Sequence, residues 1–149
     1  MTRESSDGLI LLVEDRPDEV ELMKQALHQA GIKNPLRVLS DGSEAIAYLE
    51  GRDRFADRGA WPLPSLVLLD LKLPKRSGLD IVAWAKQDPR LKRIPMIIVT
   101  SSRETSDMEK AYTAGANSYL VKPTSFREFV ETMKITGTYW IHHNAGLAP

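Results

Sequence analysis

The sequence predicts an α/β fold in which five parallel strands form one sheet with helices on both faces. Short apolar runs rich in Leu, Ile and Val mostly do not alternate with polar residues, which is typical of strands buried on both faces. A helical pattern follows each run, which indicates five consecutive βα units with right-handed crossovers. A length of 149 residues fits one domain with a sizeable core, and five units are too few for an eight-stranded barrel.

The expected strands are apolar runs of three to five residues, at 9–13, 36–39, 65–69, 96–99 and 119–121. The expected helices cover residues 17–30, 43–50, 78–87, 107–114 and a segment that starts after Ser125. Gly31, Gly51, Gly115 and Pro89 follow the first four helices as stop signals. Three capping boxes are expected at helix starts, namely Asp41 with Glu44, Ser106 with Glu109, and Ser125 with Glu128.

We expect one domain at residues 8–137, with residues 1–7 and 138–149 as terminal extensions. The polar link at 51–64 contains two prolines and is expected to be an irregular surface excursion. Beyond Met133 the last helix is expected to continue, so that Tyr139, Trp140 and Ile141 lie past the sheet. Aromatic surface of this kind is enriched at interfaces, which favours a homodimer; the open alternative is that the tail folds back onto its own domain.

Composition excludes several classes of protein. Twenty basic and twenty acidic residues give no net charge, so the bulk positive field of a non-specific nucleic-acid binder is absent. With no cysteine there are no disulfides, thiolate metal sites or thiol nucleophiles. No apolar run approaches the ~20 residues of a membrane helix, and the first eight residues lack signal-peptide order. We therefore expect a soluble cytoplasmic protein without nucleic-acid or membrane partners.

Two further groups of residues have a simple interpretation. The basic cluster of Lys86, Arg90, Lys92 and Arg93 is expected to be a solvated face, because acidic residues surround it in sequence. The three histidines have no metal-ligand spacing with the acids.

Polar side chains follow the strands where the carboxyl ends of a parallel sheet meet, which is the ligand-binding edge of such folds. The residues delivered there are Glu14, Asp15, Asp70, Thr100, Ser101 and Lys122. Each has an ordinary structural alternative, such as Asp15 capping the first helix or Lys122 being a surface charge. Together, three neighbouring carboxylates repel one another unless a cation is present, and oxygen ligands suit Mg²⁺.

This chemistry matches formation of an aspartyl-phosphate. A carboxylate beside Mg²⁺ can act as a nucleophile toward phosphorus, while the metal and an ammonium neutralise the transferring oxygens. Asp70, central in the sheet, is the expected nucleophile. Asp15 and Glu14 are expected to hold the metal, and Lys122 and Thr100 the phosphoryl group.

Four segments carry a family resemblance: ILLVED (10–15), LLDLKLP (68–74), IIVTS (97–101) and YLVKP (119–123). With them, residues 8–135 resemble the receiver domain of two-component response regulators. The resemblance implies a flavodoxin-like, doubly wound five-stranded parallel sheet in the order 2-1-3-4-5 with five helices. It also implies phosphorylation of Asp70 by a sensor histidine kinase, in a protein that catalyses only its own phosphorylation and dephosphorylation and is not otherwise an enzyme.

The resemblance further implies direct Mg²⁺ contacts from Asp15, Asp70 and the backbone carbonyl of Lys72, with Glu14 acting through water. It implies a cis peptide bond before Pro123, which would position Lys122.

Thr100 and Tyr119 are expected to form a coupled switch, read out on the fourth helix, fifth strand and fifth helix. Lys72 stands where the family often has a neutral residue, and its side chain is expected to pair with Glu14 or to cover the phosphoryl group.

Within the family, the chain is most similar to stand-alone regulators that partner bacterial phytochrome-type histidine kinases. This similarity rests on the long link before the third strand, the stretch at 88–95 and the aromatic pair Tyr139 and Trp140.

Three alternatives remain. A haloacid-dehalogenase-type phosphatase needs a second Asp two residues after the nucleophile, where this chain has Lys72. A flavodoxin-like cofactor binder needs a phosphate loop after the first strand, where acidic residues 14–18 would repel phosphate. A pseudo-receiver would bind proteins without being phosphorylated, and the complete set of acids, Thr100 and Lys122 argues against it.

Overall fold

The computed structural model describes residues 8–145. Its strands form one parallel sheet in the order β2-β1-β3-β4-β5, which confirms the predicted fold. The strands are β1 (Ile10–Val13), β2 (Leu36–Leu39), β3 (Leu66–Leu69), β4 (Met96–Thr100) and β5 (Ser118–Val121). The central strands β1, β3 and β4 are buried throughout, as their unbroken apolar runs predict.

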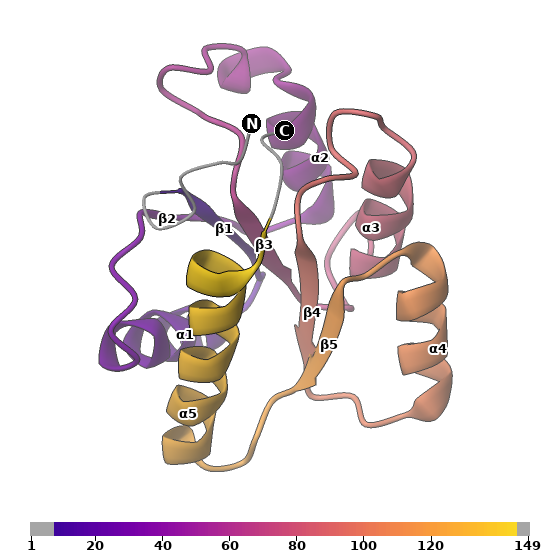
Figure 1. Cartoon of the computed structure of the whole chain (residues 1–149). Coiled ribbons are helices and arrows are strands. Elements are labelled where there is room, and N and C mark those ends of the chain that lie inside the picture. The colour runs from indigo at the N-terminus through magenta and orange to yellow at the C-terminus, as the bar shows by residue number, and fades with distance from the viewer. Residues whose placement is uncertain (1–7, 146–149) are drawn as a thin grey trace.

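Two layers of helices cover the sheet (Figure 1). The helices are α1 (Pro17–Gln29), α2 (Gly42–Glu50), α3 (Gly78–Lys86), α4 (Thr105–Ala114) and α5 (Phe126–Gly137). Apolar residues of α1 and α5 pack in one core cluster, and those of α2, α3 and α4 pack in the other, on opposite faces of the sheet. No helix within residues 8–145 is long and apolar enough to span a membrane.

Two of the three expected capping boxes supply the predicted cap. The side chain of Asp41 accepts from the backbone N–H of Glu44 at 2.8 Å, and that of Ser125 accepts from Glu128 at 3.3 Å. The box predicted for the fourth helix is wrong, because α4 starts two residues earlier and Ser106 lies inside its first turn. Its N-cap residue is Glu104, whose side chain makes no capping hydrogen bond.

The link at 51–64 is not only a polar excursion. It contains a short 3₁₀ helix, η2 (Asp53–Phe55), and its two aromatic side chains return to the domain. Phe55 and Trp61 pack at 5.0 and 6.1 Å between ring centroids from Tyr48, which is fully buried on α2. Burying these rings removes a large apolar surface from water, and this favourable free energy explains why a segment of polar composition folds against the core.

Lys86 does not belong to a solvated basic face. Its ammonium donates to the backbone carbonyls of Lys92 and Ile94 and to the side-chain oxygen of Asn117, at 3.2, 2.9 and 2.9 Å. Burial lowers the pKa of Lys86 to about 8. The side chain therefore ties the end of α3 to the loop before β4 and to the residue preceding β5.

The tail after α5 both continues the helix and packs on its own domain. A π-helical segment, η3 (Thr138–His143), follows α5 directly. Ile141 is buried in the core cluster of α1 and α5, and Trp140 packs partly buried against it. Only Tyr139 of the three expected interface residues is exposed, at 50%. The prediction that all three tail residues form an interface is therefore wrong, because burying the Ile141 side chain in the core is more favourable than exposing it to water.

Candidate functional site

A cleft of about 800 Å³ lies at the carboxyl ends of the strands. Its walls include six residues that the sequence analysis singled out: Asp15, Asp70, Lys72, Thr100, Ser101 and Lys122. Glu14 lies buried at the end of β1, and its carboxylate reaches Lys122 of this cleft. The sheet order therefore brings together residues that are more than 100 positions apart in the chain.

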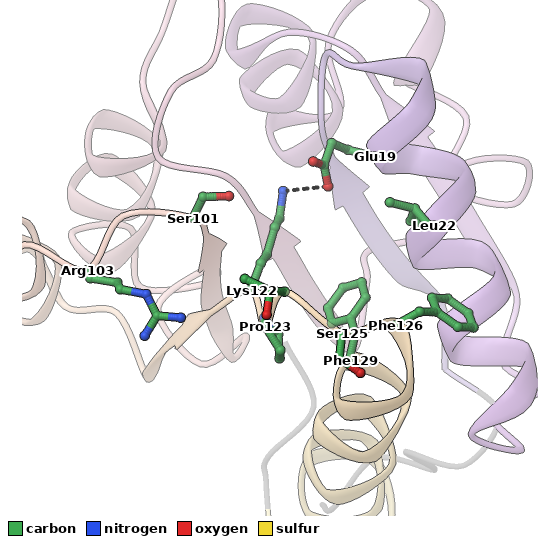
Figure 2. Close-up of a pocket in the computed structure, with 10 residues that line it drawn as sticks. Glu19, Leu22, Ser101, Arg103, Lys122, Pro123, Ser125, Phe126 and Phe129 are labelled. Carbon is green, nitrogen blue, oxygen red and sulfur yellow. Dashed lines mark ion pairs between the residues drawn. The ribbon is translucent and has the colours of Figure 1, made fainter.

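Lys122 is the central cation of the cleft. Its Nζ lies 3.0 Å from Glu14 Oε1, 3.2 Å from Glu19 Oε2 and 3.8 Å from Asp70 Oδ2. Figure 2 shows its side chain directed toward Glu19 on α1. Burial by itself would lower the pKa of Lys122, but the hydrogen bond and charge of Glu14, with the other two carboxylates, hold it above its ordinary value. The ammonium is therefore charged at neutral pH.

Glu14 is the most buried acid of the site, with a side chain only 4% exposed. Its Oε1 accepts from Lys122, and its Oε2 accepts from the backbone N–H of Arg16 at 3.3 Å. Burial raises the pKa of Glu14, and the charge of Asp70 adds to the rise that Lys122 partly opposes. Among residues 8–145 Lys72 forms no ion pair with Glu14, whose charged partner is Lys122, so the first of the two roles expected for Lys72 is not observed.

Asp70 follows β3 and points into the cleft with one oxygen fixed. The backbone N–H of Leu71 donates to its Oδ1 at 2.7 Å, while Oδ2 faces Lys122. Gly78, the first residue of α3, packs directly beneath this backbone, and a Cβ there would lie 2.1 Å from the carbonyl oxygen of Asp70. The glycine therefore allows α3 to set the position of the Asp70 backbone.

Asp15 does not cap the first helix. The N-cap residue of α1 is Arg16, whose side chain makes no capping hydrogen bond. The Asp15 side chain is exposed and lines the cleft instead. This placement leaves its carboxylate available to a ligand of the site.

Thr100, the last residue of β4, is buried, and Tyr119 on β5 is half-buried. Both side chains bond to the backbone of the same residue, Ser102, in the loop that follows β4. Ser102 donates its backbone N–H to Thr100 Oγ1 at 3.4 Å, and Tyr119 Oη donates to the Ser102 carbonyl at 3.0 Å. A physical connection between the two expected switch residues is therefore present.

The cis peptide bond implied before Pro123 is not observed. No cis peptide bond occurs among the residues that the structure describes, and both Lys122 and Pro123 are among them. The bond is therefore trans, which is the isomer that X–Pro bonds favour by about 0.5–1 kcal/mol.

A second, smaller pocket of about 370 Å³ adjoins the cleft (Figure 2). The two hollows share Glu19, Ser101, Arg103 and Lys122 as wall residues. The other walls of the pocket are largely apolar and come from α1 and from the start of α5: Leu22, Pro123, Phe126 and Phe129. An apolar surface thus leads directly to the charged cleft.

The donor set of the cleft fits a hard divalent ion that retains water. Within residues 8–145 no three acidic, histidine or cysteine side chains converge closely enough to form a metal cage by themselves. Mg²⁺ is usually held by one or two carboxylates and several waters, so Asp15 and Asp70 are sufficient as charged ligands. Glu14, whose two oxygens accept from Lys122 and Arg16, fits the expected indirect role through water.

Two residues of the site were missed from the sequence. Glu19 lies one helical turn beyond the acidic pair, and only the docking of α1 on the sheet turns it toward Lys122. Ser102 lies two residues beyond Thr100, and its role depends on the path of the loop. The acidic first turn of α1 was the available signal for Glu19.

The fold and site match a known family. The model for the response regulator receiver domain matches residues 10–134, so the chain belongs to this family. It is 36% identical over 141 residues to the probable methanogenesis regulatory protein FilR2 of Methanothrix harundinacea, covering 95% of this chain and 88% of that protein. It is 34% identical over 133 residues to the response regulator Rcp1 of Synechocystis sp., covering 89% of this chain and 88% of that protein.

Solved structures agree with this assignment. The response regulator RPA3017, described in red light signaling of R. palustris, has a TM-score of 0.90 at 32% identity, covering 95% of this chain and 99% of that one. The phosphorylated cyanobacterial phytochrome response regulator RcpA gives 0.86 at 31%, covering 94% and 98%. The Mn²⁺-bound form of Rcp1 gives 0.84 at 33%, covering 95% and 99%. The chain is thus a receiver domain close to the phytochrome response regulators Rcp1 and RcpA.

Proposed function

We propose that this chain is a response regulator that accepts a phosphoryl group on Asp70 from a phosphohistidine of a sensor kinase. A carboxylate oxygen of Asp70 forms the new O–P bond as the P–N bond to the imidazole breaks, and the imidazole nitrogen takes a proton from solvent. The chain acts on itself and turns over no separate substrate. The observation that carries the proposal is the Lys122 ammonium 3.8 Å from Asp70 Oδ2, beside Thr100.

The side chains around Asp70 suit a bound phosphoryl group, which carries two negative charges over three oxygens, better than an unmodified carboxylate. Lys122 supplies a positive charge that is maintained by its three acidic neighbours. The Thr100 hydroxyl and the exposed Ser101 at the cleft wall supply hydrogen-bond donors for phosphoryl oxygens. Lys72 and Arg103 line the same cleft as further cations, and Lys72 is proposed to cover the phosphoryl group.

A divalent ion completes this site in our proposal. Asp15, Asp70 and the backbone carbonyl of Lys72 would hold Mg²⁺, and Glu14 would act through water. The ion would neutralise phosphoryl oxygens and so assist transfer to a carboxylate. The similarity of this chain to the Mn²⁺-bound form of Rcp1 supports a divalent ion in the same fold.

Thr100 and Tyr119 are proposed to report phosphorylation. A phosphoryl oxygen on Asp70 would give the Thr100 hydroxyl a new acceptor and draw it toward the cleft. Tyr119 would then occupy more of the space beside Thr100, which shifts the population between two packings. The hydrogen bonds that both residues make to Ser102 support this coupling.

The proposed donor is a histidine kinase of the phytochrome type. The apolar pocket beside the cleft, with Leu22 41% exposed on α1, offers a docking surface from which a partner histidine could reach Asp70. The red-light and phytochrome associations of RPA3017 and RcpA support the phytochrome class.

The balanced charge of the chain gives no reason to add a nucleic acid or a membrane to its partners, and we place the protein in the cytoplasm.

We further propose that the chain forms a homodimer through the outer face of α5. Ile135 is 70% exposed, and Tyr139 lies four residues later on the same face at 50%. Glu128 and Glu131 lie at three- and four-residue spacing before Ile135, and His142 lies in the π-helical segment after α5; all three are exposed. Two such helices packed antiparallel about Ile135 would bring Glu128 of one near His142 of the other. The surface is therefore complementary to itself.

Reaction with acetyl phosphate tests the central proposal without a kinase. The chain should gain one phosphoryl group by intact mass in Mg²⁺ and none in EDTA, and Asp15→Ala should slow the gain while remaining folded. A pseudo-receiver would gain no phosphoryl group under either condition. A phosphatase would instead release phosphate continuously without retaining the group.

A further inference from the structure

Every polar group of Ser102 is engaged, and its partners belong to three different parts of the receiver. Its backbone N–H donates to Thr100 Oγ1 at 3.4 Å, and its carbonyl accepts from Tyr119 Oη at 3.0 Å. Its hydroxyl donates to Asp107 Oδ2 at 2.5 Å, a short charge-assisted hydrogen bond, and accepts from the backbone N–H of Glu104 at 3.3 Å. Ser102 thus joins the phosphoryl cleft, β5 and the first turn of α4.

The first turn of α4 lacks the side-chain cap that three other helices have. Helices α2, α3 and α5 each have such a cap, whereas the N-cap residue of α4, like that of α1, supplies none. Ala111 is the one fully buried residue of α4, so packing holds the helix only lightly. The Ser102–Asp107 bond is therefore a principal tie between the start of α4 and the sheet.

The hydrogen bond that Thr100 accepts from Ser102 leaves its own hydroxyl hydrogen available. A hydroxyl has one hydrogen to donate, and because Thr100 Oγ1 accepts from Ser102, its own O–H stays available to the cleft. The 3.4 Å separation is long for an N–H···O bond, so a small displacement of Thr100 changes its strength substantially. A movement of Thr100 therefore changes the hydrogen bond that it accepts from the backbone of Ser102.

We infer that Ser102 is a positioning residue that transmits the state of Thr100 to the first turn of α4 through its hydrogen bond to Asp107. The inference rests on the proposed phosphorylation of Asp70, because only a phosphoryl group gives the Thr100 hydroxyl a new acceptor. The phosphorylated chain differs in its contacts at Thr100, and the Ser102–Asp107 bond converts that difference into a change at α4. Ser102 touches no reacting atom in this role.

Amide NMR of the full chain tests the inference, with Mg²⁺ and beryllofluoride as the phosphoryl mimic. In the wild type, amide signals at both Asp70 and α4 should shift when the mimic is added. In Ser102→Ala the shifts at Asp70 should persist while those in the first turn of α4 are lost. Ser102→Thr keeps the hydroxyl and should restore the α4 shifts. Ser106→Ala, the same change at an exposed residue of that turn, should respond as the wild type does.

The outcomes separate this inference from the proposed function. Shifts in the α4 turn of Ser102→Ala equal to those of the wild type, with Asp70 responding in both, would overturn the role of Ser102 alone. Equal loss in Ser102→Ala and Ser106→Ala would overturn it as well, because α4 would then be generally sensitive. A wild-type chain whose Asp70 amide does not respond would contradict the proposed function and, with it, the inference.

Discussion

Lys122 and Glu14, 108 positions apart in the chain, form a hydrogen-bonded ion pair of 3.0 Å at the base of the cleft. Their side chains are only 12% and 4% exposed. A carboxylate buried to this extent is costly unless it is paired, which explains why the pKa of Glu14 is raised even beside an ammonium. The pair holds the lysine of the site in place before any ligand arrives.

The raised pKa of Glu14 predicts a pH dependence of stability with a definite sign. The folded chain binds this proton more tightly than the unfolded chain, so the stabilising contribution is complete below 4.5 and is lost as pH rises through the folded pKa. Glu14→Gln cannot titrate but still accepts from Lys122. The unfolding free energy of Glu14→Gln minus that of the wild type should therefore increase with pH, measured by urea titration in EDTA. A difference that stays constant from pH 4 to neutrality would contradict the assignment.

Gly78 should tolerate no side chain. Gly78→Ala puts a Cβ 2.1 Å from the carbonyl oxygen of Asp70, so the backbone must move, at a cost of about 1–3 kcal/mol. Phosphorylation by acetyl phosphate should slow because Asp70 moves with it. The matched control is Gly59→Ala, in an exposed loop where the nearest atom is a flexible carboxylate at 3.2 Å. Equal stability and equal rates in both variants would contradict this account.

Tyr119 should change its rotamer population on phosphorylation. Its hydroxyl donates to the carbonyl of Ser102, and beryllofluoride with Mg²⁺ should increase the population that points toward Thr100. Ring NMR of labelled tyrosine measures this population directly, and Tyr119→Phe, which lacks the hydroxyl, should respond less. Identical populations with and without the mimic would remove Tyr119 from the switch.

The proposed dimer can be tested by exchanging charges across it. Glu128 lies in the first turn of α5 and His142 near the end of the π-helical segment after it, 14 residues later, so they cannot touch within a chain. Glu128→Lys and His142→Glu should each reduce the dimer fraction, and the double variant should restore it, as measured by light scattering at several concentrations. Lys110→Glu, on exposed α4, is the control. A wild-type monomer at every concentration, with or without beryllofluoride, would defeat the dimer.

Sequence patterns predicted the fold well because the buried strands are continuous apolar runs. β2 was predicted to the residue, and the other strands to within one residue at an end. The pattern also predicted that Asp70, Thr100 and Lys122 follow strand ends at one edge, since the carboxyl ends of parallel strands meet there, while the strand order itself came from the family resemblance.

The remaining features depend on tertiary contacts that local patterns do not contain. Glu19 reaches Lys122 because of the way α1 docks on the sheet. Helix α4 begins before the predicted cap at Ser106, and Ser102 of the preceding loop bonds Asp107 in its first turn. Ile141 was expected beyond the sheet because helix length alone does not reveal the π-helical turn that returns it to the core.

The most direct test of the account is transfer from a kinase labelled on its histidine. Asp70→Asn retains the shape of the side chain but removes the nucleophile and one charge of the metal site. With Mg²⁺, the wild-type chain and Asp80→Asn, which alters an exposed carboxylate of α3, should both take up label, whereas Asp70→Asn should take up none. Label on Asp70→Asn at the wild-type level would contradict the assignment of Asp70 as the phosphoacceptor.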